Sequence, residues 1–378
     1  MGGRGDILRP WMVGIVGSVL GAAFLVQAVV GSDGDPTVFL NVGVDNRDII
    51  EFANSQLGSV SLIPEAGHDG KFFFIQATDP WITEPGIYLR LLDRPTYRAG
   101  RVAYPALAGG FGAFPVAWLP WSLAITNVLA MGLGTWATSR LAVHHGLTPL
   151  YGVAFLANPG VFNEFFISGS GVLALALALA GLVASEHGRW KIAATVLAFA
   201  VLAREVMMLW VLGAAAWWWR NGQKRTGLAV VSVSATVWSA WMAWVWFRLG
   251  SDSSAAASIG VPFVGIAQAS RGWLAAPGVD LLVSGLLVAA GLLIAVKAVR
   301  APGLLTWSAA GFVIMAPILT RPIWQRYFDS TRALSPLFTV AVLLLALAVR
   351  ERTSSGRGTV MASHTQDGDD RRTLRHER

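Results

Sequence analysis

A carboxylate between two glycines is the first feature of this chain that could do chemistry. The run Gly67-His68-Asp69-Gly70-Lys71 precedes three consecutive phenylalanines at 72–74. Glycine lets the backbone approach a ligand closely, and an aspartate within reach of a hydroxyl can act as a general base. Asp69 is therefore a candidate base. The structural alternative is a turn aspartate that precedes an amphipathic helix at the membrane surface.

Arginine recurs at three further places. Tyr97-Arg98-Ala99-Gly100-Arg101 brings two guanidinium groups three residues apart, which a helix would place near one face. Arg204-Glu205 lies between two apolar runs, where a charge is costly and is a functional candidate by default. The segment 321–332 contains Arg326 and Arg332. Arginine donates bidentate hydrogen bonds to phosphate. The alternatives are membrane anchors, an internal ion pair and solvated loop charges.

The composition indicates what must position these residues. Hydrophobic residues make up 54% of the 378 residues and charged residues only 13%, about half the charge of an ordinary soluble domain. The apolar residues come in blocks near the ~20 residues that cross a bilayer as a helix. A soluble globular enzyme, a disordered chain and a collagen-like chain are therefore excluded. Cysteine is absent, so no disulfide or thiolate metal site exists.

We therefore expect an all-α multi-pass membrane protein with a transmembrane domain over 1–350. About ten stretches are predicted to cross the bilayer: 10–30, 120–140, 149–166, 170–185, 190–203, 205–219, 226–248, 279–298, 303–320 and 333–350. Between them, we expect a large polar first extracytoplasmic loop at 31–101 and a second outer loop at 249–278. A juxtamembrane hairpin is predicted at 102–119, which is broken by proline and glycine, and a disordered cytoplasmic tail at 351–378.

Basic residues in short connections predict the orientation, because such connections tend to be cytoplasmic. With a cytoplasmic N-terminus, the basic connections all fall on the cytoplasmic side, as does the C-terminus: Arg140; Arg189 and Lys191; Arg220, Lys224 and Arg225; Lys297 and Arg300; Arg350, Arg352 and Arg357. The chain is then a plasma-membrane protein with its candidate site outside. The formal charge of +7 is scattered between spans, so we expect membrane lipids and not nucleic acid as partners.

The predicted outer face is nevertheless rich in positive charge. It carries Arg47, Lys71, Arg90, Arg94, Arg98, Arg101, Arg204, Arg248, Arg271, Arg321, Arg326 and Arg332. This set departs from the usual bias of membrane proteins. We therefore expect an anionic partner outside to compensate for it, and phosphate is the natural candidate.

These residues together resemble the multi-pass GT-C glycosyltransferases. Bacterial members have a first loop that reads approximately YDGQFYY…A.DP…YR..RI.YP, and a later L-T-R-E-T stretch. The matching residues are Asp69-Gly70-Lys71-Phe72-Phe73-Phe74, Ala77, Asp79-Pro80, Tyr97-Arg98, Arg101-Val102, Tyr104-Pro105 and Leu202-Ala203-Arg204-Glu205-Val206. His68 and Lys71 depart from the family's Tyr and Gln, and Ala203 and Val206 from its threonines.

The resemblance implies an inverting glycosyltransferase that takes sugar from a polyprenyl phosphate to a glycan, lipid or protein acceptor. It assigns Asp69 as the base, with Asp33, Asp35 and Asp45 as rivals nearer the first helix. Arg98, Arg101, Arg204 and Lys71 become candidates for the donor phosphate, and His68, Tyr97, Glu205, Arg326 and Arg332 become supporting residues.

The implied chemistry requires no cofactor. A divalent metal is compatible with it but unsupported, because the spacing of His68 and its acidic neighbours is not diagnostic of a metal site. A transporter or flippase of lipid-linked glycans and a non-catalytic scaffold for envelope assembly are the alternatives. The sugar, acceptor and oligomeric state are left open.

Overall fold

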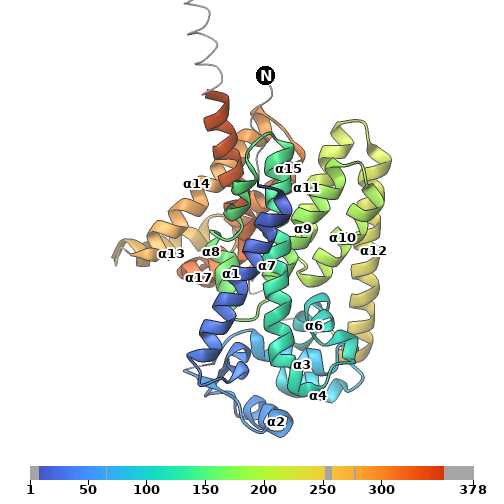
Figure 1. Cartoon of the computed structure of the whole chain (residues 1–378), viewed down its shortest axis with the longest axis vertical. Helices are drawn as coiled ribbons and strands as arrows, with labels where there is room; N and C mark the ends of the chain where they lie inside the picture. Colours follow the sequence, from blue (N-terminus) through green and yellow to red (C-terminus); the bar gives the residue numbers. More distant parts are fainter. Residues whose placement is uncertain (1–7, 65, 252–257, 276–277, 353–378) are drawn as a thin grey trace, which may run out of the picture.

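The computed structural model describes residues 8–64, 66–251, 258–275 and 278–352. This part of the chain is almost entirely helical (Figure 1). Its elements are α1 (Pro10–Val30), η1 (Pro36–Leu40), β1 (Val42–Gly43), α2 (Arg47–Leu57), β2 (Leu62–Ile63), α3 (Gly70–Thr78), α4 (Pro85–Leu91), α5 (Pro95–Ala99), α6 (Ala103–Ala108), η2 (Gly110–Gly112), η3 (Val116–Trp118), α7 (Leu119–His144), η4 (Pro149–Ala154), α8 (Pro159–Phe166), α9 (Gly171–Glu186), α10 (Trp190–Ala203), α11 (Met207–Arg220), α12 (Lys224–Leu249), α13 (Val264–Ala275), α14 (Val279–Arg300), α15 (Leu304–Met315), η6 (Ala316–Ile318), α16 (Arg321–Gln325) and α17 (Tyr327–Ala333), followed by a helix over Ser335–Arg352.

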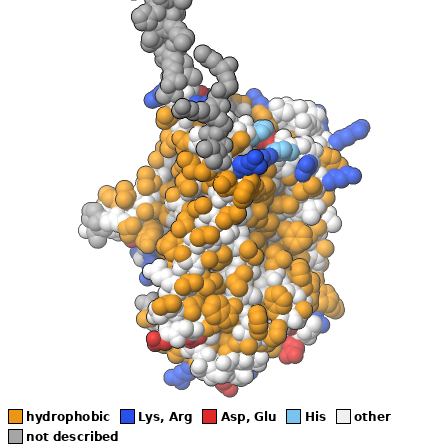
Figure 2. Space-filling model, in the orientation of Figure 1, with side chains coloured by type: hydrophobic (Ala, Val, Ile, Leu, Met, Phe, Trp, Pro, Cys, Tyr) orange, Lys and Arg blue, Asp and Glu red, His pale blue; other side chains and the backbone are white. Residues whose placement is uncertain are grey.

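Four helices are long and apolar enough to cross a membrane. These are α1, α7 with η3 before it, α12 and α14; a fifth candidate is α17 with the C-terminal helix, which are bent by 74°. Three shorter apolar helices, α9, α10 and α15 with η6, lie among them. The broad hydrophobic surface between two charged ends agrees with a membrane protein (Figure 2). The expected all-α fold is confirmed, and the long apolar helices agree with a membrane protein. The count of about ten spans and the extracytoplasmic position of the first loop stay predictions.

The predicted span at 149–166 is not one helix. It divides into η4 and α8, because Pro149 and Pro159 each begin a new helical segment. Asn158 caps α8 by accepting a hydrogen bond from the backbone N–H of Gly160 at 2.9 Å. The buried side chain of Asn158 also donates to the backbone carbonyl of Ser335 at 2.6 Å. The break thereby ties the start of α8 to the C-terminal helix.

The basic connections lie together at the end of the molecule where α1 begins (Figure 1). Arg350 donates to the backbone carbonyl of His145 at 2.8 Å, and the His144 ring is 3.1 Å from the Glu186 carboxylate. The connection after α7 thus contacts both the end of α9 and the end of the C-terminal helix. These three ends lie together, as the distribution of basic residues predicted. The side of the membrane on which this end lies stays a prediction.

At the opposite end, residues 31–101 fold into short helices and one small parallel strand pair, β1 with β2. Asp35 stabilises this loop, because its carboxylate accepts hydrogen bonds from the backbone N–H of Thr37 at 2.8 Å and from the Ser61 hydroxyl at 2.6 Å. Asp79 of the Asp-Pro pair accepts from the backbone N–H groups of Thr83 and Glu84. Both aspartates therefore use their carboxylates in hydrogen bonds that stabilise the loop backbone.

Candidate active site

Asp69 lies at the start of α3, which is pressed against two other segments. A Cβ added to Gly70 would lie 2.5 Å from the carbonyl oxygen of Phe39 and 2.9 Å from that of Ile167. Gly67 has a φ of +67°, and a Cβ there would lie 2.2 Å from the Asn41 oxygen. The two glycines are thus required by close backbone approach. They fix Asp69 between the first loop and the segment after α8.

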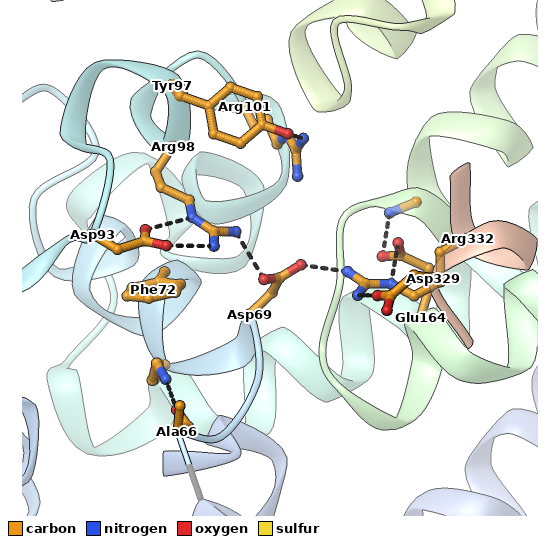
Figure 3. Close-up of polar contacts among 12 residues, drawn as sticks. Ala66, Asp69, Phe72, Asp93, Tyr97, Arg98, Arg101, Glu164, Asp329 and Arg332 are labelled. Atoms are coloured by element: carbon orange, nitrogen blue, oxygen red, sulfur yellow. Dashed lines mark hydrogen bonds and ion pairs between the residues drawn. The ribbon is translucent and has the colours of Figure 1, made fainter. Parts of the chain in front are cut away.

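The carboxylate of Asp69 bridges two arginines from distant parts of the chain (Figure 3). Arg98 at the end of α5 donates to one oxygen at 2.8 Å, and Arg332 of α17 contacts the other. The side chain of Asp69 is only 16% exposed. Burial alone would raise its pKa, but Arg332 and then Arg98 hold the pKa well below its usual range. Asp69 is therefore ionised and a weak base while both arginines hold it.

Arg332 links Asp69 to a second buried carboxylate. Its Nε donates to Glu164 at 2.9 Å, and Arg204 donates to the same oxygen of Glu164 at 2.8 Å. The Glu164 side chain is 3% exposed, and its other oxygen accepts from the backbone N–H of Gly171. The buried Nε of Arg204 makes no hydrogen bond within the described part of the chain. Because unpaired buried donors are rare, this N–H is a candidate contact for an anionic ligand.

Arg101 forms a separate pair with Glu205. Its Nε and one terminal nitrogen each lie 3.0 Å from a Glu205 oxygen, in bidentate geometry. Arg101 also donates to the hydroxyl of Tyr97 and lies 4.6 Å from the centre of that ring. Arg204 and Glu205, adjacent in sequence, therefore pair with different partners and not with each other.

The pairing corrects one expectation. Arg98 and Arg101 do not share one helical face, because α5 ends at Ala99 and the two side chains turn to different carboxylates. The external anion expected beside the outer arginines stays a prediction. Arg98, Arg101, Arg204 and Arg332 each already contact a carboxylate of the chain. A phosphate that entered this site would therefore have to compete with these carboxylates for the guanidinium groups.

The other predicted residues lie outside the network. Lys71 is buried, and its ammonium contacts the backbone carbonyl of Ala66. His68 is exposed, with its ring centre 5.2 Å from that of Phe328. Arg326 is exposed and precedes α17. Of the rival bases, Asp33 and Asp45 are exposed and Asp35 fastens the loop.

Sequence reasoning missed one carboxylate and undervalued another. Asp93 accepts from Nε and a terminal nitrogen of Arg98 at 2.9 and 3.1 Å, and its only sequence signal is its position five residues before that arginine. Glu164 lies among the phenylalanines of 162–166, where the sequence indicates only a single carboxylate at an outer helix end. In the structure it is the shared partner of Arg204 and Arg332. The chain folds back over 168 residues to form the second of these pairs, and no local pattern encodes that contact.

Two openings are lined by carboxylates that bind these arginines. A polar pocket of about 360 Å³ is lined by Asp93, Phe72, Arg90 and the residues 45–49. An apolar groove of about 700 Å³ begins at Glu205 and continues along α11, α15 and Trp238 of α12. The network thus reaches a polar cavity in the first loop through Asp93, and the separate Arg101–Glu205 pair reaches an apolar groove between long helices.

The cationic groups of this arrangement are the guanidinium groups of its arginines. Among the described residues, no group of three or more His, Asp or Glu side chains is arranged to hold a metal ion. The searches for similar proteins gave no match to any family model, curated protein or solved structure. The site itself is therefore the basis on which a function can be assigned.

Proposed function

We propose that the chain is a membrane glycosyltransferase that uses a polyprenyl-phosphate-linked sugar as donor. The observation that carries this proposal is the carboxylate of Asp69, which Arg98 and Arg332 hold. The Arg98 partner Asp93 lines a polar pocket, and Glu205, the partner of Arg101, lines an apolar groove. The GT-C-like sequence pattern agrees with it. An isoprenoid chain suits the groove, and its phosphate suits the arginines near the groove's Glu205 end.

The two openings suggest which substrate approaches from which side. Arg101 lies beside the start of the groove through its pair with Glu205. Arg204, which precedes Glu205, has a buried N–H without a hydrogen-bond partner among the described residues. We assign these two residues, with Arg332 and Arg98, to the donor phosphate. The acceptor hydroxyl approaches from the pocket that Asp93 lines. Asp69 then lies between donor and acceptor, where a general base is needed.

In the proposed reaction, Asp69 becomes a stronger base when its arginines move from the carboxylate to the phosphate of the donor. The entering phosphate draws guanidinium groups away from Asp69, which raises the pKa of that carboxyl toward its ordinary range. Asp69 then accepts the proton of the acceptor hydroxyl, whose oxygen attacks the anomeric carbon of the sugar. The bond from that carbon to the phosphate oxygen breaks, and the polyprenyl phosphate leaves with the electron pair. The arginines stabilise the negative charge that develops on it.

The test is sugar transfer from radiolabelled polyprenyl-phosphate donors by purified protein in proteoliposomes. We expect transfer by the wild type and its loss in Asp69→Asn. Asp33→Asn is the matched control, because Asp33 is an exposed rival of the first loop that lies outside the acceptor pocket, and its substitution should leave transfer intact. Thermal unfolding of each variant verifies that it is folded. Normal transfer by folded Asp69→Asn would refute the base assignment.

The same vesicles distinguish a transporter from a glycosyltransferase. If no donor gives transfer but labelled lipid-linked glycan crosses the bilayer, the protein is a flippase. If neither activity is found and outer carboxylates can be replaced without effect on envelope assembly in cells, the scaffold interpretation holds.

A further inference from the structure

A second pocket lies at the end of the molecule opposite Asp69. It occupies about 530 Å³ between the start of α1, the end of α7, the end of α9 and the start of α10. Its apolar wall includes Trp11, Trp136 and Ile192, and Arg140, His187 and Arg189 line it with polar groups. In the view of Figure 2, Lys, Arg and His side chains gather at this end above the hydrophobic surface.

The contacts of His187 determine the charge of the pocket. Its Nδ1 lies 2.7 Å from the backbone carbonyl of Val183, which requires that this nitrogen donate. Its Nε2 lies 2.6 Å from a terminal nitrogen of Arg140, which has no acceptor and must donate to it. The ring is therefore neutral in this arrangement. It orients the Arg140 guanidinium without compensating its charge.

Neither arginine of the pocket has a carboxylate partner in the part of the chain that the structure describes. Within the residues that the structure describes, neither Arg140 nor Arg189 forms an ion pair. The nearest carboxylate in sequence, Glu186, lies 3.1 Å from the ring of His144. This distinguishes the pocket from the Asp69 network, where every arginine has a carboxylate partner. The pocket therefore has two positive charges available to an anion.

We propose that this pocket binds the headgroup phosphate of an anionic glycerophospholipid. Trp11 is 52% exposed and Ile192 50%, so the apolar side of the pocket is continuous with surface that faces the acyl chains of a bilayer. Tryptophan is the residue typical of the headgroup level. Basic pockets between transmembrane helices are known sites for anionic headgroups. A soluble anion would use the arginines but would leave the apolar wall uncovered.

The test is lipid retention by the full chain. The protein is reconstituted in nanodiscs of phosphatidylcholine with a minor fraction of phosphatidylglycerol, and retained lipids are counted by native mass spectrometry. We expect the wild type to retain phosphatidylglycerol preferentially. The double variant Arg140→Gln/Arg189→Gln should lose about fivefold in this preference for each arginine. The matched control is Lys224→Gln/Arg225→Gln, two basic residues at the same end of the bundle that do not line the pocket, and it should retain the preference.

A second variant covers the case in which the double variant fails to fold. Ala184→Phe would fill the pocket from α9 and leave both arginines in place, and it should reduce retention equally. An equal loss in the Lys224/Arg225 control would mean diffuse attraction and would overturn the site. Displacement of phosphatidylglycerol by an equimolar polyprenyl phosphate would assign the pocket to that lipid instead. Because sugar transfer is not measured, the result does not depend on the function proposed for Asp69.

Discussion

At the scale of single residues, the site is a set of carboxylates held by arginines that differ in burial. Glu164 is 3% exposed and serves two guanidinium groups, whereas Asp93 is 48% exposed and serves one. Removing one partner of a buried pair leaves an uncompensated charge, but exposed pairs contribute little because water screens them. The two carboxylates should therefore differ strongly in their effect on stability.

We expect Glu164→Gln to lower the free energy of unfolding by on the order of 3 kcal/mol, because Arg204 and Arg332 would lose their shared counter-charge. Asp93→Asn should lower it by less than about 1 kcal/mol. Denaturant unfolding in detergent, followed by tryptophan fluorescence, compares the two variants. Equal losses would contradict the assignment of Glu164 as the buried centre of the network.

The lowered pKa of Asp69 gives a prediction with a definite sign. A carboxyl whose folded pKa is depressed contributes stability above its unfolded pKa of about 3.9, and this contribution is lost as the pH falls through the lower folded value. The difference in melting temperature between wild type and Asp69→Asn should therefore be constant from pH 8 to pH 5. A difference that shrinks steadily over this range would mean that the arginines do not hold the carboxylate.

At the scale of elements, the long spans could be predicted from sequence and the first loop could not. The predicted stretches 10–30 and 226–248 agree with Pro10–Val30 and Lys224–Leu249 within two residues at each end, because hydrophobic length alone determines such helices. The break at Asn158-Pro159 was visible as a proline, but its role depends on a contact with Ser335. The short helices of 31–101 depend on loop contacts such as those of Asp35 and Asp79, which have no sequence period.

The position of α3 can be tested through its first residue. In Gly70→Ala, the new methyl group would meet the backbone oxygens of Phe39, Leu40 and Ile167, and backbone cannot easily give way. We expect a loss of about 1–3 kcal/mol, together with weaker sugar transfer because Asp69 moves with α3. Gly86→Ala is the control, since a Cβ at the start of α4 meets nothing within 4 Å. Melting temperatures and transfer rates of the two variants are compared. If Gly70→Ala has the melting temperature and transfer rate of the wild type, α3 can move without loss of stability or activity.

At the scale of the whole molecule, one arrangement accounts for both groups of positive charge. The basic connections lie together at the end where α1 begins (Figure 1), and the paired arginines lie toward the other end with Asp69. Pairing with carboxylates explains how arginines could be on an outer face that should be poor in positive charge. This part of the fold could not be predicted, because the partners of Arg332 and Arg101 are 263 and 104 residues away.

The arrangement predicts on which side of the membrane each end lies. Reporter fusions that are active only in the cytoplasm, joined after His144, Gly222 and Gly260, sample three connections. We expect activity after His144 and Gly222, because both follow helices that end among the basic connections, and none after Gly260, which follows the opposite end of α12. A second reporter that is active only outside the cytoplasm should give the inverse pattern. Cytoplasmic activity after Gly260 would put the Asp69 network on the side where no lipid-linked sugar donor is expected, and would contradict the proposed function together with the topology.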